Sequence, residues 1–276
     1  MLYILGATIV VVGIAFFIFQ IWDDIGAVGR IAVTLGLGLL MTAMGSVLLK
    51  NKPDEHIGSV FHFLGGMLIP GGAVVTLSEL STPDPTLWPV AITFGVITVF
   101  YLLLNSVHRS AILTFFTIGN ATAFFYLLVE AIVEGPSYMH DDLYAYLTMV
   151  VGLSYLLLAH SFRDGWNRKL IEILYFFGIT GFLGGAFSQV FDSVPWRMLY
   201  FFLVMGGLLL AVFTKNRSIL VMSTLFLIAH VSYITSEYFA DSIGWPISLV
   251  ILGFLFIGLG YASITINKKY ISESTS

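Results

Sequence analysis

The sequence predicts an all-α fold, a polytopic transmembrane helix bundle of about ten spans. Of its 276 residues, 58% are hydrophobic and 10% are charged, whereas soluble domains are about 45–50% apolar and about 25% charged. The apolar residues form blocks of about 20, the length that crosses a hydrocarbon layer of roughly 30 Å as a helix. They do not alternate with polar residues, as the strands of a membrane barrel do.

Clusters of charged residues, proline and glycine separate the blocks and define the expected spans. The first block is too long for a signal-peptide core and has no basic residue before it, so we expect a retained span. The short loops leave no room for an extramembrane domain, and residues 1–276 are expected to form a single integral membrane domain. The spans are predicted at 2–22, 29–49, 57–78, 88–105, 110–133, 143–161, 170–190, 196–214, 218–238 and 245–266.

The basic residues divide by loop. Arg30 and Arg197 fall in odd-numbered loops, and the other ten of the twelve lie in even loops or the C-terminal tail. Those ten are Lys50, Lys52, Arg109, Arg163, Arg168, Lys169, Lys215, Arg217, Lys268 and Lys269. Because basic loops stay on the cytoplasmic side, we expect a multi-pass protein of the cell membrane with both termini in the cytoplasm.

Short echoes along the chain indicate internal repeats. Trp88 and Trp196 begin two spans, and Arg109-Ser110 matches Arg217-Ser218 at the same interval. These matches predict repeat units 29–133 and 143–238, and a second echo relates 1–49 to 218–266. A period of four spans keeps both copies in the same orientation, so parallel repeats are expected rather than inverted ones.

The first half of the chain carries LGATIVVVGIAFF, IGAVGRIAVTLGLGLLMTAMGSVL, a Gly-rich third span and an Arg-Ser turn before TFFTIGN. In these segments it resembles families of bacterial-type polytopic membrane proteins of unknown function, which are built from repeated Gly/Leu-rich hairpins. The resemblance implies the architecture and supplies no activity, substrate or site residue.

Glycine and proline inside two spans are the first candidates for a functional site. Pro70, Gly71 and Gly72 lie near the middle of the third span, and Gly181, Gly184 and Gly185 near the middle of the seventh. Broken helices expose backbone groups to a solute in many transporters. The alternative is that small residues only let helices pack closely.

Buried polar residues are the second set. Asn120 and His230 lie near the middle of the fifth and ninth spans, where polar groups are costly unless paired or solvated. They either line a central cavity or make local hydrogen bonds between helices.

Acidic and amide side chains at the expected outer ends of the odd spans are the third set. If they converge, they form an electronegative vestibule; otherwise they are helix ends that meet water. They are Gln20, Glu79, Glu130, Gln189 and Glu237.

Histidines on the expected inner side raise two further options, namely haem ligation by a facing pair and an ion pair with Glu172. They are His56, His62, His108 and His160. His140-Asp141-Asp142 in an outer loop either touches a metal or is simply solvated. Nothing in the spacing favours a bound group, so no cofactor and no metal site are predicted.

These observations favour a transporter or flippase of a small or amphipathic solute without an ATPase of its own, with its path between the third and seventh spans. We expect no enzyme activity, because zinc-protease, serine-hydrolase and phosphate-loop motifs are absent, and no nucleic-acid partner. Expected partners are the lipid bilayer, a small solute or lipid, and other membrane proteins. The alternatives are an assembly subunit of a membrane complex and a lipid-modifying enzyme built around His62, His160 and Glu172.

Overall fold

The computed structural model describes residues 22, 24–51, 57–80, 86–133, 141–239, 245–266 and 268–269, with scattered positions between 6 and 20. Apart from short turns these residues are helical, and none of them lies in a strand. The first predicted span falls mostly outside them. The helices are α2 (Ala27–Ile31), η1 (Ala32–Gly36), α3 (Leu37–Asn51), α4 (Ile57–Leu80), α5 (Trp88–His108), α6 (Ala111–Ile132), α7 (Asp141–Ser161), η3 (Phe162–Asp164), η4 (Trp166–Leu170), α8 (Ile171–Ser188), α9 (Val194–Thr214), α10 (Arg217–Phe239) and α11 (Trp245–Ile266).

Within the described residues, eight helical stretches are long and apolar enough to cross a membrane. They run from Ala27–Asn51 to Arg217–Tyr238 and match the second to ninth predicted spans. The tenth span coincides with α11, whose described apolar part is Phe256–Ile266. The all-α multi-pass class is therefore confirmed, and the count of ten spans stays a prediction.

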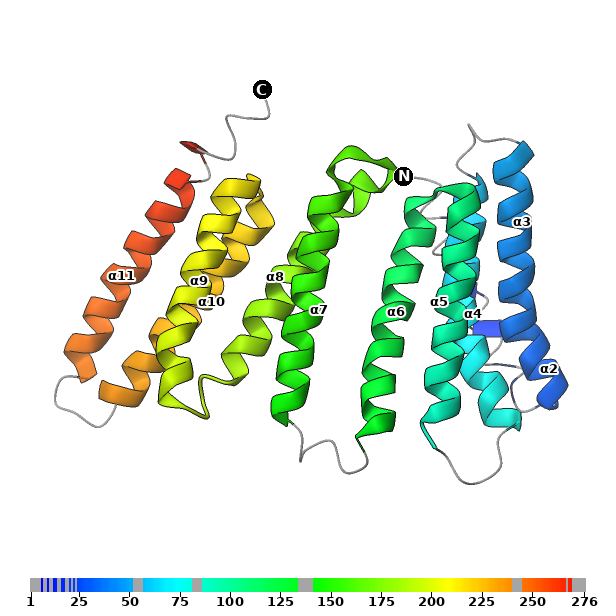
Figure 1. The fold of residues 1–276 in the computed structure, drawn as a ribbon, viewed down its shortest axis with the longest axis horizontal. Helices are drawn as coiled ribbons and strands as arrows, with labels where there is room; N and C mark the ends of the chain where they lie inside the picture. The colour runs from blue at the N-terminus through cyan, green and yellow to red at the C-terminus, as the bar shows by residue number, and fades with distance from the viewer. Residues whose placement is uncertain are drawn as a thin grey trace. The chain divides into compact units, whose positions relative to one another are not determined.

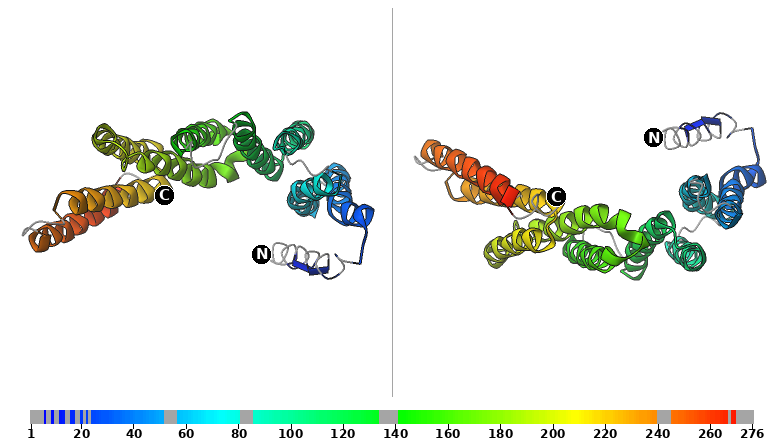
Figure 2. Two further views of the ribbon diagram at one scale, coloured as in Figure 1. Left: turned by 90° about the horizontal axis from the view of Figure 1, so that it is seen from below. Right: turned by 90° about the horizontal axis from the view of Figure 1, so that it is seen from above.

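The chain divides into two compact units, an N-terminal unit of residues 1–135 and a C-terminal unit of residues 136–276. In the N-terminal unit α3 packs on α4, α5 packs on α6, and α4 touches α6. In the C-terminal unit α7 packs on α8, α9 packs on α10, and α8 touches α10 (Figures 1 and 2). The boundary lies between the predicted repeats 29–133 and 143–238. The repeats, the echo of 1–49 in 218–266 and the single membrane domain stay predictions.

Small residues at intervals of seven hold α3 against α4. Gly58, Gly65 and Gly72 on α4 are all buried, as are Gly38 and Gly45 on α3. A side chain at Gly58 would come within 3.0 Å of the Gly45 carbonyl oxygen. An interval of seven keeps side chains on one face of a helix, and small residues let two backbones approach closely in lipid.

Small residues at intervals of seven also line the contact between α7 and α8. Ala145, Gly152 and Ala159 occupy every seventh position of α7 and are buried, opposite Gly178 and Gly185 on α8. A side chain at Gly152 would meet the backbone nitrogen of Phe182 and come within 2.7 Å of the Gly178 carbonyl oxygen. The α3–α4 and α7–α8 hairpins thus each bring two helices into contact through their backbones.

The second hairpin of each unit turns through two residues. Arg109 and Lys215 end α5 and α9 in the left-handed conformation, with φ angles of 46° and 53°. Ser110 and Asn216 follow, and α6 and α10 begin at the next residue. The Asn216 side-chain oxygen accepts a hydrogen bond from the Ile219 nitrogen at 3.0 Å, which caps the start of α10.

Candidate functional site

A line of polar residues follows one face of α10 in the C-terminal unit. Asn216, Ser223, His230 and Glu237 are spaced seven residues apart, from the residue before α10 to its last turn. We call these four residues the α10 polar line. Successive members are about 10.5 Å apart along the helix axis. The line therefore extends from one end of the span to the other.

The two central members of the line are buried in a face that α9 covers. Ser223 is fully buried and lies opposite Gly207, where a side chain would come within 2.6 Å of the Ser223 hydroxyl oxygen. The His230 ring lies 5.0 Å from the Tyr200 ring, between centroids. Tyr200 in turn donates its hydroxyl proton to the Leu183 carbonyl oxygen on α8, at 3.2 Å. The line thus lies where α8, α9 and α10 meet.

Both central members hold a buried polar atom without a hydrogen-bond partner in the described part of the protein. These atoms are the Ser223 hydroxyl oxygen and His230 Nδ1, and Thr180 on α8 has a buried hydroxyl in the same situation. Polar atoms buried in a span cost free energy unless water, an ion or a ligand satisfies them. Unpartnered atoms of this kind make the α10 polar line the candidate site.

An ion pair closes the end of the line at Glu237. The Glu237 carboxylate lies 3.3 Å from Arg197 on α9. The Arg197 Nε also donates to the Val190 carbonyl oxygen at 3.2 Å, and its guanidinium lies over the Tyr233 ring. This end thus carries an ion pair.

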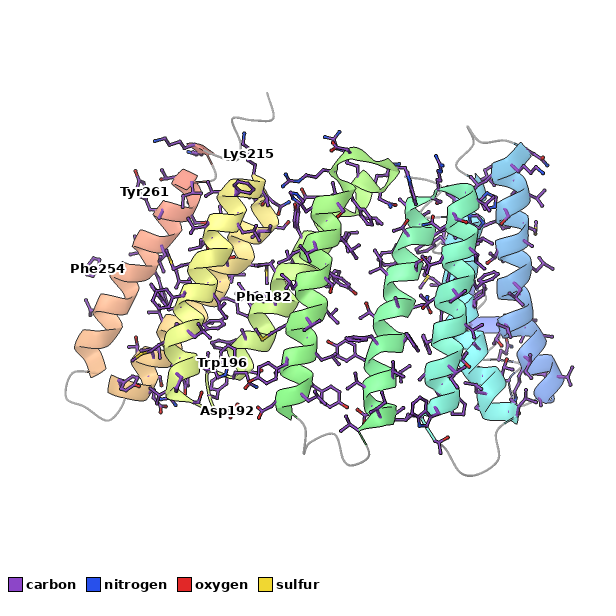
Figure 3. The ribbon with its side chains drawn as sticks, in the orientation of Figure 1. Phe182, Asp192, Trp196, Lys215, Phe254 and Tyr261 are labelled. Carbon is purple, nitrogen blue, oxygen red and sulfur yellow. The ribbon has the colours of Figure 1, made fainter. Side chains whose placement is uncertain are left out.

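At the other end Asn216 donates its side-chain amide to the Glu172 carboxylate on α8, at 3.2 Å. The Ser218 hydroxyl donates to the second oxygen of the same carboxylate, also at 3.2 Å. Figure 3 shows Lys215 at this end of the unit and Asp192 and Trp196 at the opposite end. The α10 polar line therefore runs between two polar clusters, one around Glu172 and one around Arg197.

The N-terminal unit does not continue such a line. When the left-handed residues Arg109 and Lys215 are matched, instead of Arg109 and Arg217, the corresponding positions are Ser110, Thr117, Phe124 and Ala131. Thr117 is buried like Ser223, but the positions matching His230 and Glu237 are apolar. A continuous polar line on this face is thus a property of α10 and not of its counterpart α6.

The glycines and proline proposed from the sequence lie in unbroken helices. Pro70 is inside α4, which continues to Leu80, and α8 continues through Gly184 to Ser188. Gly72 meets the backbone of Leu35 in the π-helical segment η1, and a side chain at Gly185 would come within 2.7 Å of the Ala145 carbonyl oxygen. These contacts agree with the close-packing alternative at both residues.

Gly71 and Gly184 differ from their neighbours, because an added side chain at Gly71 meets nothing and one at Gly184 meets Phe226 at an ordinary 3.6 Å. The residues of α4 belong to the N-terminal unit and those of α8 to the C-terminal unit. The path expected between the third and seventh spans therefore stays a prediction.

Asn120 and His230 also belong to different units. Asn120 on α6 is buried, and its amide donates to the Phe116 carbonyl oxygen of its own helix at 2.7 Å. That bond is local but not interhelical, while His230 belongs to the α10 polar line. The central cavity that the two residues were expected to share is not established.

Among the predicted vestibule residues, two carboxylates are neutralised within their own units. Glu79 accepts a hydrogen bond from Arg30 at 2.8 Å, as Glu237 pairs with Arg197. Gln189 is buried and donates to the Asp142 carboxylate at 3.0 Å, while Glu130 is half-buried on α6. Arg30 and Arg197 are the two basic residues that fall in odd-numbered loops. Each forms an ion pair with a glutamate at the same end of its unit.

The histidines also divide between the two units. His62 and His108 lie in the N-terminal unit with ring centroids 5.5 Å apart, whereas His160 and Glu172 lie in the C-terminal unit and are exposed. His56 and His140 lie outside the described residues. Within the described chain, no group of three or more His, Cys, Asp or Glu residues could hold a metal ion.

Eight apolar helices of membrane-spanning length in the described residues define this chain as a multi-pass helical membrane protein. Comparison with protein-family models, with curated protein sequences and with solved structures gives no match in any of the three.

Sequence reasoning missed the α10 polar line, although its signal is in the sequence. His230 and Glu237 were each singled out for their depth, but the interval of seven that links them to Ser223 and Asn216 was not counted. The unpartnered state of the central polar atoms had no sequence signal, because it depends on which residues α8 and α9 present to them.

Proposed function

We propose that the protein is a transporter or flippase of the cell membrane that moves a small or amphipathic solute without hydrolysing ATP. The observation that carries this proposal is the α10 polar line, with unpartnered polar atoms on Ser223 and His230 in the middle of a span. Ionisable residues inside spans mark solute and ion pathways in many membrane proteins.

The chemistry of the line suits a weakly charged solute that forms hydrogen bonds. Its middle offers a hydroxyl and an imidazole, and its two ends offer an ion pair and an amide–carboxylate pair. No net charge faces the middle from the described part of α9, where Gly207 and Tyr200 lie opposite. A strongly charged solute would need a fixed counter-charge there.

Purified protein in liposomes tests the proposal with three probes. Stopped-flow light scattering reports the entry of glycerol and of urea, and dithionite quenching reports the movement of a fluorescent phosphatidylcholine between leaflets. We expect at least one probe to move faster than in protein-free liposomes. If no probe moves, and the protein instead copurifies with a stable membrane-protein partner, the assembly-subunit alternative is favoured.

Variants then locate the path. His230→Phe gives α10 the residue that α6 has at Phe124, and Ser223→Ala removes the second unpartnered group. Losing one hydrogen bond to the solute costs about 1.4 kcal/mol or more in a span, so we expect about tenfold slower flux. Ser232→Ala is the control, because Ser232 is on α10 but bonds only the Ile228 carbonyl oxygen in the described structure. Equal flux in His230→Phe and the control would remove the α10 polar line as the path.

We further propose that both termini face the cytoplasm. Lys50 and Arg109 lie at one end of the N-terminal unit and Arg30 at the other, while Arg168 and Lys215 lie opposite Arg197 in the C-terminal unit, which supports this orientation.

A further inference from the structure

His62 is the most deeply buried histidine of the described chain. It lies on α4 between two other helices of the N-terminal unit and has no exposed surface. Its Nε2 lies 3.0 Å from the Ser46 hydroxyl oxygen on α3, and its ring is 5.5 Å from that of His108 on α5. Three helices therefore contribute to the surroundings of one imidazole.

The hydrogen bonds of Ser46 relate to which nitrogen of His62 carries the proton. The Ser46 hydroxyl donates its single proton to the Thr42 carbonyl oxygen at 3.0 Å. In the tautomer that agrees with this bond, the Ser46 oxygen accepts from His62 and the imidazole is protonated at Nε2. Nδ1 is left with a lone pair, and this atom is buried and without a partner in the described structure.

The orientation of the ring turns this lone pair away from α3. The Cδ2 edge of His62 faces Gly45, where a side chain would come within 2.6 Å, and Nε2 faces Ser46 on the same helix. Nδ1 lies on the opposite edge of the five-membered ring. The second imidazole in contact, that of His108, comes from α5 and not from α3.

We propose that His62 and His108 bind one first-row transition-metal ion, with Nδ1 of His62 as a ligand. A metal about 2.0–2.1 Å from each ring nitrogen holds two imidazole centroids roughly 5–6 Å apart at tetrahedral or slightly wider angles. The observed 5.5 Å lies in this range. The bond from Nε2–H to Ser46 is the outer-shell contact that orients metal-binding histidines.

One of the two histidines is partly exposed. His108 is the last residue of α5 and is half-buried, next to the turn at Arg109. Two nitrogens leave coordination positions for water or for a transferred ligand. Neutral imidazoles suit copper and zinc, and copper(II) binds most tightly among the divalent ions of this series, so copper(II) is the most sensitive probe.

The test uses full-length protein with a histidine-free affinity tag, stripped with a chelator and titrated with Cu²⁺. We expect one tightly bound copper per chain, with an electron paramagnetic resonance spectrum split by two imidazole nitrogens. His108→Ala, at the rim of the helix, should lower the affinity at least tenfold and leave coupling to one nitrogen. His160→Ala, an exposed histidine of the other unit, should change nothing.

Two further variants separate ligation from folding. Ser46→Ala keeps both ligands and should weaken binding about tenfold or more through loss of the outer-shell bond. His62→Gln should lose the site, with the elution profile in detergent reporting whether the variant is folded. No tight binding by the wild-type protein, or equal binding by His108→Ala and His160→Ala, overturns the proposal. The outcome is independent of any solute flux along α10.

Discussion

At the scale of single residues, the glycines of this protein fall into two groups that one added methyl group should distinguish. A side chain at Gly152 meets backbone atoms of α8, which cannot move without shifting the helix. Gly206 on α9 is helical and has nothing within 4 Å of an added side chain.

We therefore expect Gly152→Ala to lower stability by about 1–3 kcal/mol through overpacking. Gly206→Ala should raise it by roughly 0.5–1 kcal/mol, because alanine is the better helix former. Thermal unfolding of both variants in the same detergent measures the difference. A Gly152→Ala protein as stable as Gly206→Ala would show that the backbones of α7 and α8 are not in contact.

Residue chemistry was only partly predictable from the sequence. From the sequence alone, Glu79 and Glu237 are candidate vestibule residues, and Arg30 and Arg197 are the two basic residues in odd-numbered loops. The sequence alone does not show that these acids and arginines form ion pairs. The two partners of each pair lie on different helices, and packing decides which helices are neighbours. The ion pair of Glu237 with Arg197 forms because α9 and α10 pack as a hairpin, and that of Glu79 with Arg30 forms because α4 packs beside α2.

At the scale of elements, the two left-handed turns store strain in a predictable place. Non-glycine residues in this conformation cost roughly 1–2 kcal/mol. Arg109→Gly and Lys215→Gly should therefore raise the unfolding temperature, in spite of the added freedom of glycine in the unfolded chain. The matched control is Lys50→Gly, which removes the same charge within helix α3 and should lower it. Equal shifts in all three would mean that charge, not backbone conformation, determines the result.

The elements themselves were predicted closely. The span expected at 57–78 is α4, Ile57–Leu80, and the span expected at 196–214 is α9, Val194–Thr214. Apolar length sets these bounds, and it is a local property of the chain. The stretch before α8 differs from the prediction. The seventh span was expected to begin at residue 170, whereas Trp166–Leu170 already forms a 3-10 helix that leads into α8.

At the scale of the whole molecule, orientation in the membrane is the testable property. The protein contains no cysteine, so single cysteines can be introduced without background. We expect Leu80→Cys and Asp192→Cys to react with an impermeant maleimide on intact cells. Lys50→Cys and Arg168→Cys should react only after permeabilisation. Lys50→Cys labelled on intact cells would reverse the N-terminal unit, and Arg168→Cys labelled there would reverse the C-terminal unit.

Apolar length and the split of basic residues were enough to predict a multi-pass helical protein. They were not enough to predict the seams between helices. Gly45 and Gly58 meet across α3 and α4 because their helices pair as a hairpin, and the interval of seven becomes informative only when that partner is known. Likewise, Asn120 and His230 looked equivalent in depth, but they belong to separate units.

The two-residue turns at Arg109-Ser110 and Lys215-Asn216 have a consequence for biogenesis. A linker of two residues is too short to let the two helices separate and pair with distant helices. The second helix must leave the translocon directly behind the first and in contact with it. We therefore expect α5 with α6, and α9 with α10, to enter the bilayer as pairs.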